Sequence, residues 1–214
     1  MKRRDFSTQL LTAALGLPFV GMARAQGEPV EGQNYVKLNQ PVPVPSNGKV
    51  DVVEFFWYGC PHCYALEPYV EAWAKRLPAD VNFHRAHVAF SALHETHSKV
   101  YYALESMGVL EQVHRKVFNA IHQQHKRLDK ESDIEAFMTE SGIDGKKFID
   151  VFKSFAVQTK VRQAKQLSEA YKVDGVPTLG VHGRYWTNVG MAGSQERTLA
   201  VVDYLAQKVR SGGR

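Results

Sequence analysis

Cys60 and Cys63 are the only cysteines in the chain, and they lie three positions apart in the stretch EFFWYGCPHCYALEP. A disulfide between them closes a loop too short to stabilise a fold of 214 residues. Their spacing indicates reactive sulfur chemistry instead, either exchange of a disulfide or binding of a metal. The elements around the two sulfurs decide between these possibilities.

The residues that flank Cys60 predict that it stands at the start of a helix. Val50 to Tyr58 form an apolar, strand-like run that ends at Gly59, and apolar residues recur with helical spacing after Cys60. Pro61 suits the first turn of that helix. The free backbone N–H groups and the dipole at a helix N-terminus favour a thiolate, so the pKa of Cys60 should fall.

This placement predicts different roles for the two sulfurs. A low pKa stabilises the reduced form, which makes the disulfide a stronger oxidant. His62 should add to the effect by its positive charge or by a hydrogen bond to the sulfur. We expect Cys60 to be the attacked sulfur of a mixed disulfide and Cys63, one turn deeper, to be the resolving partner.

Glu54 is the single charged side chain in the strand-like run from Val52 to Tyr58. A carboxyl group buried in a strand is costly unless it is paired or protonated. Since Glu54 precedes Cys60 by six residues, we expect it to lie under the site and to accept or relay the proton of Cys63. The alternative is that Glu54 faces solvent at the edge of the sheet.

A metal site is the minor interpretation, because about four ligands are needed and the chain has no second pair of cysteines. Three histidine pairs have the three-residue spacing that can share a helix face. With nine histidines in the chain, such pairs arise by chance, and we expect them to be ordinary surface residues and no metal to be bound. The pairs are His84/His87, His94/His97 and His122/His125.

The order of elements predicts an α/β fold. A short edge strand near residues 35–38 precedes a β-α-β unit made of a strand at 50–58, a helix after Cys60 and a strand at 81–90. Helical spacing then continues from Leu93 to Tyr171, which indicates a helical subdomain. A hairpin follows around Gly183, and a last helix spans about 194–209. Pro68 should kink the first helix.

The N-terminus has the features of an export signal. A charged start, MKRRDF, is followed by an apolar run and by the small-residue pattern Ala23-Arg24-Ala25. Removal of residues 1–25 takes four basic residues and one acidic residue from a chain of net charge +5, so about +2 remains. That small charge gives no support to a nucleic-acid partner, and export would place the cysteines in an oxidising compartment.

The motifs EFFWYGCPHC and GVPT, with a helical block between them, resemble the DsbA family of periplasmic thiol–disulfide oxidoreductases in the thioredoxin superfamily. The resemblance implies a thioredoxin fold with an inserted all-helical subdomain. It implies that Cys60 is the nucleophile, that His62 tunes its thiolate, and that Cys63 resolves the mixed disulfide. Glu54 is then the buried acid, and Arg85 stands where relatives have a lysine.

The resemblance also implies a substrate site beside the cysteines. Pro177 should be a cis-proline, with Val176 next to it on the strand that binds substrate. Pro61 is expected to contact substrate as well. A shallow apolar surface near Trp57 and Tyr58 would bind extended chains, unless these two side chains belong to the core.

The implied domains are an export signal at 1–25, thioredoxin-fold parts at 26–92 and 158–214, and an inserted helical domain at 93–157. The leading hypothesis is a monomeric periplasmic oxidase without a cofactor, which donates its disulfide to unfolded exported proteins. A quinone-linked membrane partner resembling DsbB would recharge it. An isomerase or reductase is the alternative, although relatives with those activities usually dimerise through an extra N-terminal domain. A Cys/His metal carrier is less favoured.

Overall fold

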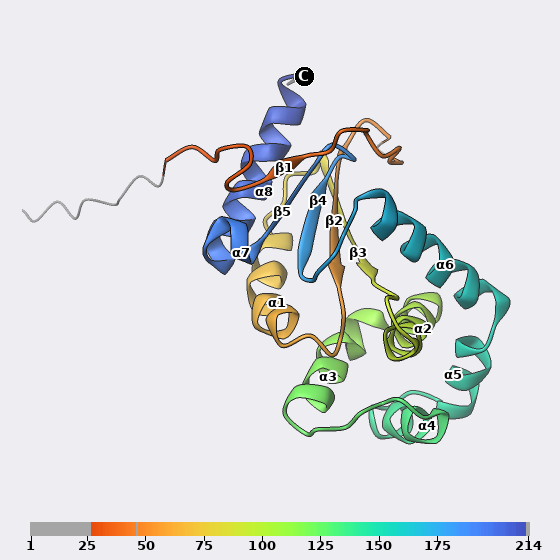
Figure 1. Ribbon diagram of the computed structural model, residues 1–214. Helices are drawn as coiled ribbons and strands as arrows, with labels where there is room; N and C mark the ends of the chain where they lie inside the picture. Colours follow the sequence, from red (N-terminus) through yellow and green to blue (C-terminus); the bar gives the residue numbers. More distant parts are fainter. Residues whose placement is uncertain (1–26, 46, 213–214) are drawn as a thin grey trace, which may run out of the picture.

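The computed structural model describes residues 27–45 and 47–212, so the expected export signal at 1–25 lies outside the described residues. At its centre is a mixed five-stranded sheet in the order β1-β5-β4-β2-β3 (Figure 1). Strands β2 and β3 are parallel, and the other neighbours are antiparallel. The strands are β1 (Val36–Lys37), β2 (Val50–Phe56), β3 (Val81–His87), β4 (Thr178–Val181) and β5 (Tyr185–Asn188).

Strand β2 is buried along its whole length because helices cover both faces of the sheet. Helices α1 (Pro61–Ala74) and α8 (Gln195–Arg210) lie on one side, and α2 (Ala92–Ser106) and α6 (Phe155–Ala170) lie on the other (Figure 1). Alternate side chains of β2 therefore enter different cores: Val52 packs with residues of α1 and α8, and Val53 packs in the core on the side of the helical block. This accounts for a continuous apolar run rather than an alternating one.

The helical block predicted from Leu93 to Tyr171 is present between β3 and β4. It contains α2, α3 (Leu110–His122), α4 (Glu131–Glu140), α5 (Gly145–Phe152) and α6. Serine or aspartate side chains accept backbone N–H groups at the starts of α2, α5 and α6, which satisfies donors that a helix start leaves free. The expected domain boundary at residue 157 falls inside α6, which begins at Phe155 and packs on both α2 and β3.

The predicted hairpin is β4–β5, and its turn requires a glycine. Gly183 has φ +66°, and a Cβ atom there would collide with the backbone of Val42. The short helix α7 (Val189–Ala192), which the sequence did not predict, joins β5 to α8. Helix α1 continues through Pro68, so the proline does not end it.

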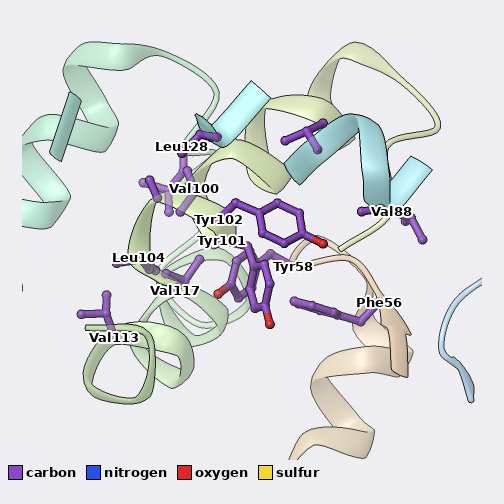
Figure 2. Packing of buried hydrophobic residues seen from close by; sticks show 14 of the residues in the cluster. Phe56, Tyr58, Val88, Val100, Tyr101, Tyr102, Leu104, Val113, Val117 and Leu128 are labelled. Carbon is purple, nitrogen blue, oxygen red and sulfur yellow. The ribbon is translucent and has the colours of Figure 1, made fainter. Parts of the chain in front are cut away.

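An aromatic core joins the end of β2 to the helical block (Figure 2). Phe56 and Tyr58 lie among aliphatic and aromatic side chains of α2 and α3, including Tyr101 and Val117 (Figure 2). Phe56 packs edge-on against Tyr58 and Tyr101, with each pair of ring centroids 5.2 Å apart. The segment that leads from the sheet to Cys60 is thus anchored by the inserted helices as well as by the sheet.

Candidate active site

Cys60 is the N-cap residue of α1, as the sequence predicted. Its backbone is extended, Pro61 occupies the first turn, and its Sγ accepts the backbone N–H of Cys63 at 3.4 Å. At a helix start, a serine or aspartate oxygen normally accepts a hydrogen bond from this backbone N–H, and here the acceptor is sulfur. A thiolate is a better acceptor than a thiol, so this geometry favours the charged form.

Hydrogen bonds lower the pKa of Cys60 from 9.0 to about 6. The largest cause is the hydrogen bond from the Cys63 thiol, which outweighs the opposing effect of burial; the backbone N–H groups of Cys63 and His62 follow. The positive charge of His62 is the smallest of these contributions, and its side chain is exposed. The predicted direction is therefore right, but the neighbouring thiol contributes more than the histidine.

Cys63 lies deeper than Cys60, as expected, with 1% of its surface exposed against 7%. Burial raises the pKa of Cys63 well above 9.0, and its hydrogen bond to Cys60 raises it further. Both cysteines are free thiols in this structure. One sulfur is thus ready to react as a thiolate, and the other holds its proton and donates it in a hydrogen bond.

Glu54 is buried in β2 rather than placed at a solvent edge, with 1% of its surface exposed. The parallel register sets Arg85 of β3 directly beside it, and Arg85 Nε donates to Glu54 Oε2 at 3.0 Å. Glu54 Oε1 has no hydrogen-bond partner among the described residues. Burial raises the pKa of Glu54 to about 7, against the lowering effect of Arg85. A carboxyl group that titrates near neutrality is suited to exchange a proton.

Glu67 of α1 is a second buried acid, which the sequence analysis missed. Arg85 also donates to Glu67 Oε1 at 2.8 Å, and burial raises the pKa of Glu67 to about 7. Although burial opposes its charge, Arg85 has a raised pKa because it lies between the two carboxylates. The available signal was the helical spacing from Cys63 to Glu67 to Val70, which places an acid on the buried face of α1.

His114 of α3 completes this buried polar cluster and was also missed. Its Nδ1 lies 2.8 Å from the Tyr58 hydroxyl oxygen, and its Nε2 lies 3.3 Å from Glu67 Oε1. Burial, with the nearby charge of Arg85, lowers the pKa of His114 to about 3, so the ring is neutral. Tyr58 is fully buried in the core and cannot contribute to an exposed substrate surface, whereas Trp57 is partly exposed.

The expectation that the paired histidines are surface residues is wrong for His87 and His97. Their exposed fractions are 0% and 2%, and both make hydrogen bonds inside the protein. Residues 27–45 and 47–212 contain no group of three or more His, Cys, Asp or Glu side chains placed to hold a metal ion. Over the same ranges, no helix is long and apolar enough to cross a membrane.

The Val176–Pro177 peptide bond is cis, and it lies next to Cys60. The Cys60 thiol donates to the backbone oxygen of Val176 at 3.4 Å. A cavity of about 400 Å³ begins there, lined by His62, Val176, Pro177, Val189 and neighbouring residues of β5 and α7. Pro61, the residue before His62, is exposed. Of the expected substrate-site residues, Val176 and Pro177 line this cavity, together with Val189, which the sequence did not single out; Pro61 is not part of the lining.

Comparison with known proteins identifies relatives along nearly the whole chain. The DSBA-like thioredoxin domain matches residues 70–199. The thiol:disulfide interchange protein DsbA of Pseudomonas aeruginosa is 44% identical over 206 residues, which cover 96% of this chain and 98% of that protein. The DsbA protein of Burkholderia cepacia is 42% identical over 211 residues, which cover 97% and 98%.

Solved structures agree with the sequence relatives. The crystal structure of Pseudomonas aeruginosa DsbA is 46% identical, with a TM-score of 0.82 over 85% of this chain and 94% of that one. DsbA from Xylella fastidiosa is 29% identical, with a TM-score of 0.80 over 86% and 98%. With its thioredoxin-like sheet, its helical insertion and its Cys60–Cys63 pair, the chain belongs to the DsbA family of thiol:disulfide oxidoreductases.

Proposed function

We propose that the protein acts as an oxidase, which donates the Cys60–Cys63 disulfide to unfolded proteins after their export. The observation that carries the proposal is the position of Cys60, whose sulfur accepts a backbone N–H at the start of α1. A sulfur held in this way is a good leaving group, and its reduced form is stabilised. The pKa of about 6 corresponds to about 4 kcal/mol in favour of the thiolate.

The transfer proceeds through two exchanges. A substrate thiolate attacks Cys60 Sγ, which forms a mixed disulfide and breaks the Cys60–Cys63 bond, so that Cys63 leaves as a thiolate and takes up a proton. Glu54 is the proposed proton donor, because its pKa of about 7 allows either protonation state. A second substrate thiolate then attacks the substrate sulfur and releases the Cys60 thiolate, leaving the substrate oxidised and the enzyme reduced. Cys63 can also attack the mixed disulfide and release the substrate unchanged.

The cavity beside the Val176–Pro177 bond is the proposed substrate site. Its lining combines apolar side chains with exposed backbone at Gly175 and Gly190, which suits an extended chain of varied sequence. His62 lines this cavity, and Pro61, which precedes it in the chain, is exposed. Recognition by shape and backbone, rather than by a charged pocket, would serve many substrates.

The surroundings of the reaction are part of the same proposal. The export signal at residues 1–25 supports a periplasmic location, and a monomer without a bound cofactor is sufficient for the two exchanges. A DsbB-like quinone-linked membrane protein is the proposed oxidant for the reduced enzyme. The proposed division of the chain keeps the thioredoxin-fold parts at 26–92 and 158–214 and the helical insertion at 93–157.

Equilibration of the mature protein with reduced and oxidised glutathione tests the proposal, with the fraction of each redox form measured after acid quenching. An oxidase should remain mostly reduced in mixtures that keep ordinary protein disulfides oxidised. It should also donate one disulfide per molecule to a reduced, unfolded protein. If the disulfide instead resists reduction and the reduced protein rearranges scrambled disulfides, the isomerase or reductase alternative is correct.

A further inference from the structure

The turn of residues 57–60, which connects β2 to α1, determines where the reactive sulfur lies. The N–H of Cys60 donates to the backbone oxygen of Trp57 at 3.0 Å, which closes the turn. The Trp57 ring folds over Gly59, where any Cβ atom would collide with it. A shift of this turn would move Cys60 Sγ relative to the N–H of Cys63, so the groups that hold the turn bear on the chemistry.

Three histidines bind the three polar groups of a single residue in this turn. The N–H of Tyr58 donates to His87 Nε2 at 3.2 Å, and His122 Nε2 donates to the Tyr58 carbonyl oxygen at 2.8 Å. The Tyr58 hydroxyl lies 2.8 Å from His114 Nδ1. His87 belongs to β3, and the other two belong to α3, so the inserted helices supply two of the three contacts.

A fourth histidine holds the other aromatic residue of the turn. Trp57 Nε1 donates to His97 Nδ1 at 3.0 Å, and His97 Nε2 donates onward to the backbone oxygen of Arg127 at 2.9 Å. His87 is fixed in the same manner, since its Nδ1 donates to the oxygen of Val88 at 2.9 Å. Each of these rings needs one donor and one acceptor nitrogen, which only the neutral imidazole provides.

Burial keeps the rings of His87 and His97 neutral. It lowers the pKa of His87 well below 6.5, and it also lowers the pKa of His97. His122 is only partly buried, and its ring stacks on Tyr64 of α1, with centroids 4.7 Å apart and planes 8° from parallel. It therefore contacts both the turn before Cys60 and the helix after it.

We propose that His87, His97, His114 and His122, here called the histidine cradle, are positioning residues that hold the turn of residues 57–60 in the conformation in which Cys60 reacts. None of the four needs to touch substrate, and they act through Trp57 and Tyr58. The proposal assigns a chemical role to the inserted helices, which supply three of the four rings. It rests on the proposed function of Cys60 as a reactive thiolate.

His122 offers the sharpest test, because it lies at the end of α3 and is the least buried member of the cradle. His122→Leu removes the donor to the Tyr58 carbonyl, and His122→Gln restores an N–H donor at a similar reach. Tyr58→Phe is a second variant, which removes only the hydroxyl at His114. His84→Gln is the matched control, since His84 contacts Asp51 rather than the turn.

The readouts are the Cys60 pKa, from the ultraviolet absorbance of the thiolate, the exchange equilibrium with glutathione, and the melting temperature. We expect His122→Leu to raise the pKa of Cys60 by about one unit, which corresponds to an about tenfold higher affinity of the sulfur for its proton. His122→Gln should recover most of this change, Tyr58→Phe should shift the pKa in the same direction, and the control should leave it at the wild-type value.

Two different failures can be told apart. If the wild-type pKa is low and stays unchanged in His122→Leu and Tyr58→Phe while the melting temperature falls, the cradle is only structural and the proposal is wrong. If the wild-type pKa is itself near 9, the proposed function fails, and the cradle proposal fails with it.

Discussion

Replacing Cys63 with alanine removes the thiol that contributes most to the low pKa of Cys60. A hydrogen bond to a charged group contributes about 1.5–3 kcal/mol, which is part of the roughly 4 kcal/mol that favours the thiolate. Its loss should raise the Cys60 pKa from about 6 to between about 7 and 8. At pH 7 the thiolate fraction should fall from about 90% to between about 50% and 10%.

Titration of the thiolate absorbance measures this change directly, since the variant keeps one cysteine. Cys63→Ser is the matched control, because its hydroxyl can still donate to the Cys60 sulfur and should keep the pKa closer to 6 than alanine does. A pKa near 6 in Cys63→Ala would refute the reasoning. It would mean that the backbone donors at the start of α1 are sufficient without the neighbouring thiol.

Three further predictions concern pH. A raised carboxyl pKa contributes stability that is fully present below the unfolded pKa of 4.5 and is lost as the pH rises through about 7. The melting temperature of Glu54→Gln, compared with that of wild type at the same pH, should therefore increase from pH 5 to pH 8. If Glu54 transfers the proton of Cys63, the same variant should lose pH dependence of disulfide transfer over this range, and an unchanged rate profile would contradict the role. The lowered pKa of Cys60 has the opposite effect on stability. Its contribution to the stability of the reduced protein is fully present above the unfolded pKa of 9.0 and is lost as the pH falls through about 6. The free energy of unfolding of the reduced form, but not of the disulfide form, should therefore increase from acid pH to pH 7 by at most about 1.4 kcal/mol, because solvent screens part of the effect. Equal pH dependence of the two forms would be evidence against the thiolate.

The sequence predicted the local part of the site well because that part depends on neighbours in the chain. The apolar run that ends at Gly59 and the proline after Cys60 identify the helix start, and the N-cap position of the sulfur follows from them. The burial of Glu54 was predictable for a similar reason, since every near neighbour on its strand is apolar except Asp51. The resemblance to the family then identified Arg85, which the strand register places beside Glu54.

The contributions of other elements could not be predicted from local pattern. His114 is 54 positions after Cys60 in the chain, and nothing in the helical spacing of α3 shows that it meets Tyr58. The paired histidines looked like chance spacing, yet two of them are buried because the inserted helices fold against the end of β2. Periodicity shows which face of a helix is buried, but the partner of that face is decided by tertiary packing.

The arginine at position 85 limits how the buried cluster can move a proton. Arginine stays charged at every pH at which the protein folds, so Arg85 can neutralise a carboxylate but cannot itself give up a proton. It donates to both Glu54 and Glu67, and each of these acids has a pKa raised by burial to about 7. Any proton that the cluster exchanges with Cys63 must therefore come from one of the two carboxyl groups, and Glu54 has the oxygen without a partner among the described residues. We expect Arg85, acting against burial, to keep the pKa of both acids close to 7, so that a small change in charge at the sulfurs is enough to move a proton.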